Sequence, residues 1–190
     1  RDLWNKFSKS NMSIQDKLDV NRELNNILKK TDLFNSVVQD ILVISDNGYY
    51  FTTIGQDGLA ANYDYWSKEW YQKAKDTTGN VYVHILGLHN QDFYSKKRAI
   101  TAKNKTFSIS FALQNSKGKV SGALIYNFDI TQLAEVLGAS NYEENGKVAI
   151  LNEEGVIMSR SDNSDIGSML KVSERDREIM KREKTGSFWT

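Results

Sequence analysis

Apolar residues recur at spacings of three, four and seven through the first thirty positions of the chain, with polar residues between them. Because side chains three and four positions apart lie on one face of a helix, this pattern predicts a long amphipathic helix over residues 2–30. The apolar stripe is narrow and partly heptad-like, so the helix packs on its own domain or pairs with a second copy, and we favour the first. The members of the stripe are Leu3, Phe7, Ile14, Leu18, Leu24, Ile27 and Leu28.

Five segments rich in β-branched and aromatic residues follow, and turn residues separate them. Asp46-Asn47-Gly48 lies between the first two, and its Asn-Gly pair supplies the positive φ angles of a tight hairpin turn. The last two segments alternate apolar and polar side chains on either side of a loop at residues 115–119, which predicts a second hairpin. The predicted strands span residues 37–46, 49–54, 81–86, 105–114 and 120–129.

Two helices are predicted among these strands. In residues 65–75, Trp66, Trp70 and Ala74 fall at helical spacing on one face, and no glycine or proline interrupts the segment. A shorter helix at residues 130–137 ends before Gly138. Helices that accompany a meander of antiparallel strands define an α+β fold, here an antiparallel five-stranded sheet flanked by helices.

A second, smaller module is predicted after Asn145-Gly146. Residues 147–152 and 156–160 form a hairpin around an acidic turn, and a charged helix spans residues 173–184. The terminal Phe188-Trp189-Thr190 starts a strand that has no further strands to pair with, so we expect a fragment of a longer protein with an incomplete module. Either the module is truncated or a neighbouring chain completes its sheet. The predicted division is a long helix at residues 1–32, a module at residues 33–141 and a partial module at residues 146–190.

Composition and charge exclude several classes of protein. The 190 residues include 25 Lys plus Arg and 24 Asp plus Glu, so the formal net charge is +1 and nucleic acid is not an expected partner. The chain has no cysteine, which excludes disulfides, thiolate metal sites and cysteine nucleophiles. No window of the sequence is long and apolar enough to span a bilayer.

Catalytic motifs are not found either. Gly-Lys pairs occur only in the turn and linker sequences KGK and NGK, and no Ser, His and Asp follow the order of a nucleophile elbow. The acidic pairs Glu143-Glu144 and Glu153-Glu154 lie in a linker and a turn, where carboxylates are usually solvated. His84 and His89 are too few for a transition-metal site and are typical of structural histidines. We therefore expect no enzyme activity, no cofactor and no metal.

Several stretches, taken in chain order, resemble a known family. They are the long N-terminal helix, the hairpin at residues 41–51, the helix WSKEWYQKA, the strand pair FSISFALQNSKGKVSGALIYNFDI and the beginning of the second module, KVAILNEEGVIMSRSDNSDIG. In this order they resemble the extracellular double-Cache sensor domain of bacterial transmembrane receptors, which has a PAS-like fold. The likeness is strongest to the domains found on sensor histidine kinases of Gram-positive bacteria.

This resemblance implies a receptor in the cell membrane, with the present domain outside the cell. The long helix would rise from the membrane, the first module would lie distal to it and bind a small molecule, and the second would lie proximal to it. The parent protein would be a sensor histidine kinase. A homodimer would form through the N-terminal helix in the full-length receptor.

The resemblance also implies an amino-acid site. In amino-acid-binding Cache domains, a tyrosine, a basic residue and a Trp-Tyr pair follow one another along the aromatic helix, and a carboxylate ends a later strand. A cation holds the ligand carboxylate, an aspartate holds its ammonium group, and aromatic rings exclude water so that both interactions strengthen. A lysine here lacks the bidentate fork of the more frequent arginine. The matching residues are Tyr63, Lys68, Trp70, Tyr71 and Asp129, with Tyr82 as a further ligand contact.

Other interpretations of the same residues stay open. Trp66 and Trp70 at helical spacing are typical of a core, Lys68 is also typical of a solvated surface, and Asp129 also suits the N-cap of the helix that follows it. A protein of another class, a carbohydrate-binding or adhesion module, would use Trp66, Trp70 and Tyr65 as a stacking platform. Such a platform leaves its rings exposed, whereas a sensor site buries at least Trp70.

Overall fold

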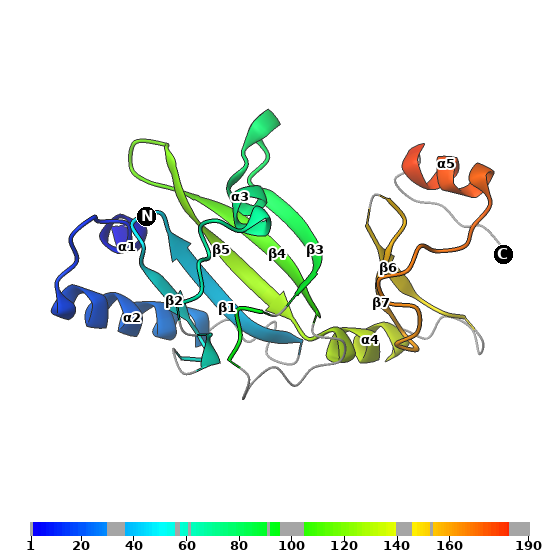
Figure 1. Cartoon of the computed structure of the whole chain (residues 1–190), viewed down its shortest axis with the longest axis horizontal. Helices are drawn as coiled ribbons and strands as arrows, with labels where there is room; N and C mark the ends of the chain where they lie inside the picture. Colours follow the sequence, from blue (N-terminus) through cyan, green and yellow to red (C-terminus); the bar gives the residue numbers. More distant parts are fainter. Residues whose placement is uncertain are drawn as a thin grey trace. The chain divides into compact units, whose positions relative to one another are not determined.

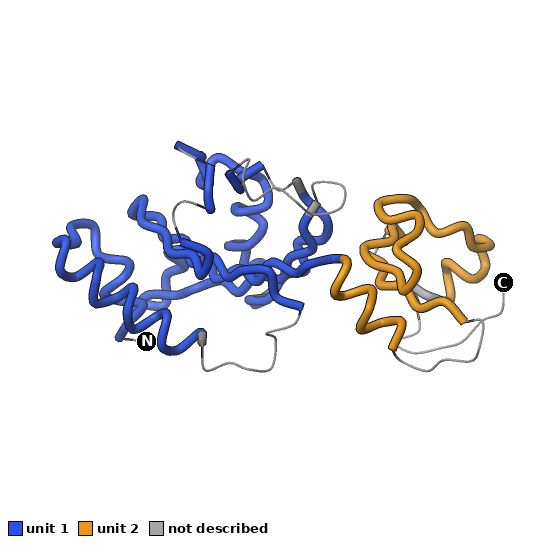
Figure 2. The backbone as a smooth tube through the Cα atoms, turned by 90° about the horizontal axis from the view of Figure 1, so that it is seen from below, with its two compact units in different colours: residues 1–130 blue, residues 131–190 orange. Residues whose placement is uncertain are grey.

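The computed structural model describes residues 2–29, 37–55, 58–60, 62–90, 92–95, 105–139, 146–152 and 154–182. Contacts divide the chain into two compact units, Arg1–Ile130 and Thr131–Thr190 (Figure 2). Within the described ranges, no helix has the length and apolar character needed to cross a membrane. The domain limits inferred from the sequence stay a prediction.

The first unit contains the strands β1 (Val38–Ser45), β2 (Tyr50–Thr52), β3 (Val83–Asn90), β4 (Lys105–Gln114) and β5 (Val120–Phe128). They form one antiparallel sheet in the order β2-β1-β5-β4-β3 (Figure 1). The two predicted hairpins are joined where β1 pairs with β5, from Val38 opposite Phe128 to Ser45 opposite Gly122. This sheet and its flanking helices confirm the predicted α+β fold class.

The strand β3 extends further than predicted, because the sequence pattern ends it at Leu86. Gly87 adopts a φ of 71° at a bulge, and the strand resumes beyond it as far as Asn90. A side chain at this position would be strained in that conformation, so the glycine permits the bulge rather than ending the strand. The continuation brings His89 into the sheet, opposite Thr106 of β4.

Two helices, α1 (Asp2–Phe7) and α2 (Ile14–Lys29), replace the single helix predicted over residues 2–30. The residues between them are mostly polar, which interrupts the apolar stripe. A capping box then starts α2. The Ser13 hydroxyl accepts the backbone N–H of Asp16, and the Asp16 carboxylate accepts the backbone N–H of Ser13, both at 3.1 Å.

The N-terminal helices cover one face of the sheet, on the side of β1 and β2. Phe7 is buried against Val43 of β1 and Phe51 of β2. Burial therefore splits the predicted apolar stripe into two parts, since Ile14 and Leu18 of α2 are 79% and 54% exposed. Leu3 and Phe7 in α1 and Leu24 and Leu28 in α2 pack in or against this core, whereas Ile14, Leu18 and Ile27 face solvent.

The opposite face of the sheet, which we call the α3 face, is covered by the aromatic helix. The aromatic helix is α3 (Glu69–Lys75), and the short 3₁₀ helix η3 (Thr78–Asn80) follows it. The helix α3 contacts β3, β4 and β5 (Figure 1). It is shorter than the predicted helix at residues 65–75, because the Asp64 carboxylate accepts the backbone N–H groups of Trp66 and Ser67 at 3.1 and 3.2 Å. These bonds close a turn, and the helix begins after it.

The core of the α3 face consists of side chains that alternate along β1 and β5 and of aromatic residues above them. Because successive strand residues point to opposite faces, every second residue of each strand reaches this core. Its fully buried members from these elements are Leu42 and Ile44 of β1, Ala123 and Ile125 of β5, Tyr65, and Tyr71 and Ala74 of α3.

The second unit is small. Its elements are α4 (Ile130–Ala139), whose first residue belongs to the first unit, the hairpin β6 (Ala149–Leu151) and β7 (Ile157–Arg160), and α5 (Glu174–Arg182). The predicted hairpin and charged helix are therefore confirmed. Ser173 caps α5, because its hydroxyl accepts the backbone N–H of Asp176 at 3.1 Å. The strand predicted at residues 188–190 lies outside the described residues.

Candidate functional site

Trp70 of α3 lies at the centre of an aromatic cluster. Its half-buried indole has ring centroids at 5.5 to 6.3 Å from those of Tyr65, Tyr71, His89 and Phe93. Tyr65, Tyr71 and Phe93 are exposed by 1% or less. Most of the cluster is therefore core, and Trp70 is a partly exposed member of it.

An edge group, formed by Tyr63, Lys68 and Asp92, adjoins this cluster. The Tyr63 hydroxyl donates to the Asp92 carboxylate at 2.9 Å, and the Lys68 ammonium group lies 3.6 Å from the other carboxylate oxygen. The ammonium also lies 4.6 Å from the centroid of the Tyr63 ring, as in a cation–π contact. Burial and the bond to Asp92 raise the pKa of Tyr63. Lys68 and Asp92 are 36% and 52% exposed, so their ion pair is solvated and weak.

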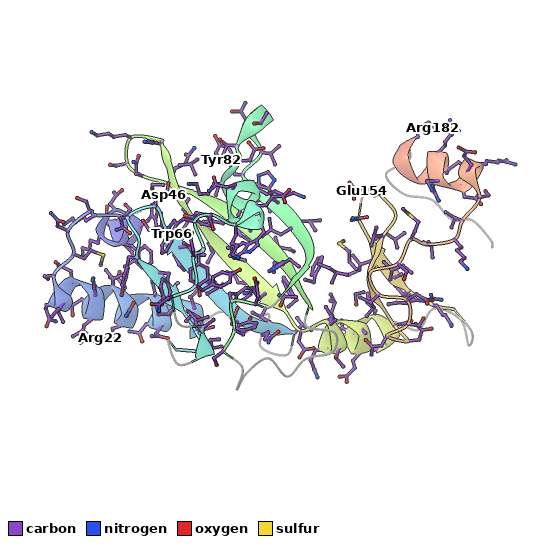
Figure 3. All side chains as sticks on the ribbon, viewed as in Figure 1. Arg22, Asp46, Trp66, Tyr82, Glu154 and Arg182 are labelled. Carbon is purple, nitrogen blue, oxygen red and sulfur yellow. The ribbon has the colours of Figure 1, made fainter. Side chains whose placement is uncertain are left out.

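Tyr71 has a different environment from the edge group. It is fully buried, and its hydroxyl donates to Asp46 Oδ1 at 3.0 Å. Lys75 Nζ lies 2.6 Å from the same oxygen. Burial, followed by the charge of Asp46, raises the pKa of Tyr71. Asp46 and Trp66 lie at the hairpin end of β1, where the Trp66 indole N–H donates to the Ser45 carbonyl at 2.8 Å (Figure 3). These contacts attach α3 to the β1–β2 hairpin.

The remaining predicted ligand contacts lie on other elements. Tyr82 is 40% exposed in the segment before β3, where its carbonyl accepts the backbone N–H of Ala112 at 2.8 Å. Asp129 is half-buried between β5 and α4, and its backbone N–H donates to the Val37 carbonyl at 2.9 Å. The structure thus brings Tyr63, Lys68 and Trp70 together, and it places Tyr71 in the core beside them. The ligand-binding roles predicted for all six residues stay predictions.

A buried polar row crosses the α3 face and starts under Trp70. His89 Nε2 lies 2.7 Å from Ser108 Oγ, Ser108 Oγ lies 2.6 Å from Asn127 Oδ1, and the Asn127 amide donates to Asp40 Oδ1. These four residues, which we call the polar row, come from the neighbouring strands β3, β4, β5 and β1. Ser108 and Asn127 are fully buried, and Asp40 is 2% exposed.

The direction of each hydrogen bond in the polar row follows from the partners. The side-chain amide of Asn127 donates its N–H to Asp40, so the side-chain carbonyl oxygen of Asn127 accepts a hydrogen bond from Ser108. Ser108 has a single hydroxyl proton and gives it to Asn127, so its oxygen accepts from His89. Nε2 of His89 therefore carries a proton. The row runs from a donor beside Trp70 to a carboxylate in β1.

The polar row is not among the sites predicted from the sequence, where His89 is typical of a structural histidine and Asp40, Ser108 and Asn127 belong to no site motif. One signal was present, because Thr106, Ser108 and Ser110 alternate with large apolar residues along β4, and all three are fully buried. Hydroxyls at core-facing positions need partners, so this alternation indicates a polar network within the core.

Comparison with known proteins shows the fold. No family model and no curated protein matches the chain. The chain is similar in structure to the ligand-binding domain of the Pseudomonas fluorescens chemoreceptor CtaA in complex with L-leucine, with a TM-score of 0.57 and 14% identity over 87% of this chain and 62% of that one. It is also similar to the ligand-binding domain of the Pseudomonas aeruginosa chemoreceptor PctB in complex with L-arginine. That match has a TM-score of 0.56 and 15% identity, and it covers 88% of this chain and 59% of the PctB chain.

A third similar structure is the periplasmic sensory domain of the Campylobacter jejuni chemoreceptor Tlp1, with a TM-score of 0.57 and 13% identity over 94% of this chain and 70% of that one. All three are sensor domains of receptors, and they share the sheet and flanking helices of this chain. The chain spans less than two thirds of the CtaA and PctB domains.

Proposed function

We propose that the first unit binds a free amino acid or a small carboxylate on the α3 face, and that the chain is the extracytoplasmic sensing part of a transmembrane receptor without catalysis of its own. The observation that carries this proposal is the arrangement around Trp70. A partly exposed indole has the polar row beneath it, and the cation of Lys68 lies over the ring of Tyr63 in the adjoining edge group. The fold shared with chemoreceptor sensor domains supports the proposal.

Lys68 supplies the positive charge for a ligand carboxylate. Its partner Asp92 is half exposed and 3.6 Å away, which is longer than a good hydrogen bond, so a ligand carboxylate competes with it at little cost. The Tyr63 ring lies 4.6 Å from the ammonium group and shields one side of it from water, which strengthens a charge-assisted hydrogen bond. CtaA and PctB are bound to L-leucine and L-arginine, so free amino acids are the first ligands to test.

The competing class, a carbohydrate-binding or adhesion module, fits the aromatic residues less well. Such a module needs ring faces that are open to solvent. Tyr65 is 1% exposed, and the Trp66 indole is fixed by its bond to the Ser45 carbonyl. Of the three proposed platform rings, only the half-buried Trp66 and Trp70 keep any exposed surface.

The parent receptor is proposed to be a sensor histidine kinase in the cell membrane, as the resemblance of the sequence implies, and to form a homodimer through its N-terminal helices. The exposed apolar side chains of Ile14 and Leu18 on α2 support pairing, because a partner helix would remove them from water. Phe7 does not contribute to that surface, since it is buried in the core.

Isothermal titration calorimetry with L-leucine, L-glutamine, L-arginine and GABA tests the proposed function. We expect at least one of them to bind, and Lys68→Ala to weaken its binding about 10-fold or more, because a charge-assisted hydrogen bond is lost. Lys17→Ala is the matched control. The Lys17 ammonium lies 5.4 Å from the centroid of the Tyr49 ring, on the side of α2, and its removal should not change the affinity. A wild type that binds no member of this panel contradicts the amino-acid proposal.

A further inference from the structure

The turn between β1 and β2, residues 46–48, is bonded to helices on both faces of the sheet. On the α3 face, Asp46 Oδ1 accepts the Tyr71 hydroxyl at 3.0 Å and lies 2.6 Å from Lys75 Nζ. Tyr71 and Lys75 are four residues apart, so they occupy successive turns of α3. The first residue of the β1–β2 turn is therefore attached to most of the length of this short helix.

On the opposite face, the second residue of the turn holds the end of α1. Asn47 Nδ2 donates to the backbone carbonyls of Phe7 and Lys9 at 3.0 and 2.6 Å, and Asn47 Oδ1 accepts the backbone N–H of Tyr49 at 2.9 Å. The last carbonyls of a helix have no partner within the helix, so a side-chain amide with two donors fixes this end. Both polar atoms of the Asn47 side chain are engaged, and its position is thereby determined.

Adjacent residues serve the two faces. Successive side chains of a strand point to opposite faces, and Asp46 and Asn47 continue this alternation beyond the end of β1. Gly48 then closes the turn with a φ of 86°. The turn is thus a connection of only two residues between α3 and α1, which lie on opposite sides of the sheet.

The proposed site acts on the helix at one end of this connection. Lys68 is the N-cap residue of α3, and its carbonyl accepts the backbone N–H groups of Tyr71 and Gln72, both at 3.1 Å. A ligand carboxylate on the Lys68 ammonium group restricts the residue from which α3 starts. Tyr71 lies in the same helical turn, so the restriction reaches its hydroxyl and hence Asp46.

We propose that the β1–β2 turn is a joint through which a ligand bound at Lys68 stabilises the end of α1. The order of contacts is Lys68, the first turn of α3, Tyr71, Asp46, Asn47 and the last carbonyls of α1. This inference rests on the proposed function, and it concerns the response to the ligand and not its recognition. The response would reach the N-terminal helices, through which the proposed receptor pairs.

Amide hydrogen exchange of the ligand-free chain, measured by NMR, tests the joint by itself. The N–H groups of Ser8 and Lys9 bond to the carbonyls of Trp4 and Lys6 at 2.9 and 3.3 Å, so their exchange reports opening of the last turn of α1. Tyr71→Phe removes the hydroxyl that bonds to Asp46. It should raise both exchange rates at least about 5-fold, the lower end of typical coupling between sites.

Two controls separate the joint from a general loss of stability. Ile125→Val removes a methylene from the core of the α3 face but no bond of the turn, so it should leave the Ser8 and Lys9 rates unchanged. The N–H of Lys17 bonds to the Ser13 carbonyl at 3.1 Å in the first turn of α2, and its rate should not respond to Tyr71→Phe.

Asn47→Ala interrupts the joint on the side of α1. In this background, Tyr71→Phe should not raise the Ser8 and Lys9 rates further, because α1 is already released from the turn. If Asn47→Ala does not fold, the comparison of Tyr71→Phe with Ile125→Val decides the question.

The ligand arm uses the panel amino acid that the wild type binds in calorimetry. At saturation, this amino acid should slow the exchange of Ser8 and Lys9 at least about 5-fold in the wild type. Asn47→Ala should still bind it, because Asn47 bonds to α1 and to its own turn, and not to α3. The exchange rates of this variant should not respond to the ligand.

The outcomes distinguish this inference from the proposed function. If Tyr71→Phe leaves the Ser8 and Lys9 rates at their wild-type values, or if Ile125→Val raises them equally, the turn is not a joint, whatever ligand binds. If an amino acid binds to the wild type without slowing these rates, the proposed function holds and the inference is wrong. If the wild type binds no amino acid of the panel, the proposed function fails, and the inference fails with it.

Discussion

The imidazole of His89 stacks on the indole of Trp70, with ring centroids 5.5 Å apart and an angle of 20° between the ring planes. The same imidazole begins the polar row through Nε2, 2.7 Å from Ser108 Oγ. A buried hydrogen-bonded network therefore supports the ring at the centre of the proposed site. Because the row ends at Asp40, it connects this ring to β1, which lies beyond β4 and β5 in the sheet.

The polar row predicts the tautomer of His89. Because Ser108 gives its only proton to Asn127, His89 must donate from Nε2. Long-range ¹H–¹⁵N NMR spectra at a pH where the ring is neutral should show the proton on Nε2. Ser108→Ala should remove this preference but leave His84 unchanged, since His84 Nε2 bonds to the backbone carbonyl of Asp76. A wild-type His89 with its proton on Nδ1 would contradict the direction derived for the row.

Sequence patterns located the sheet well where the constraint is local. The second hairpin was predicted at residues 105–114 and 120–129, and its strands span Lys105–Gln114 and Val120–Phe128. Alternating side chains and a turn of fixed type determine such a pair without long-range information. The end of β3 was misjudged, because only the pairing with β4 shows that Gly87 forms a bulge.

The candidate site was predictable in part, for the same reason. Tyr63, Lys68 and Trp70 are close in sequence, and the resemblance to amino-acid-binding Cache domains implies that they meet at one place. The polar row joins residues from four strands, with Asp40 and Asn127 separated by 87 positions. The alternation along β4 marks Ser108, but no local pattern shows which residues of the other strands it meets, because that contact depends on the register between strands.

The Tyr71 hydroxyl should contribute measurably to stability, because its bond to Asp46 attaches α3 to the β1–β2 hairpin. We expect Tyr71→Phe to lower the free energy of unfolding by about 1.5 to 3 kcal/mol, the usual loss for a hydrogen bond to a charged group. Urea denaturation measures this change. Tyr82→Phe removes the hydroxyl of a 40% exposed tyrosine and is expected to change stability by less than about 0.5 kcal/mol. Equal losses in the two variants would show that the bond to Asp46 has no special role.

Stability should fall as the pH rises above 10. Burial raises the pKa values of Tyr63, Tyr65 and Tyr71 above the ordinary value of 10.0. Above that pH the unfolded chain loses these phenolic protons while the folded chain keeps them, so alkali favours unfolding. Their contribution is fully present below pH 10 and is lost as the pH rises toward the folded pKa values. Urea denaturation at a series of pH values measures the slope, and Tyr71→Phe should make it shallower. A slope that is the same in both proteins would argue against the raised pKa of Tyr71.

Pairing through α2 should depend on Leu18. Ile14 and Leu18 are 79% and 54% exposed and lie one helical turn apart, so two copies of α2 can bury them against each other. We expect Leu18→Glu to weaken dimers of a membrane-anchored receptor about 10-fold or more, because two like charges replace an apolar contact. The unfolding midpoint should change little, since Leu18 is exposed within one chain. Asn26→Glu adds the same charge at another exposed position of α2 and is the control. Sedimentation of both variants in detergent measures the dimer fraction, and a dimer that tolerates Leu18→Glu as well as Asn26→Glu must pair through another surface.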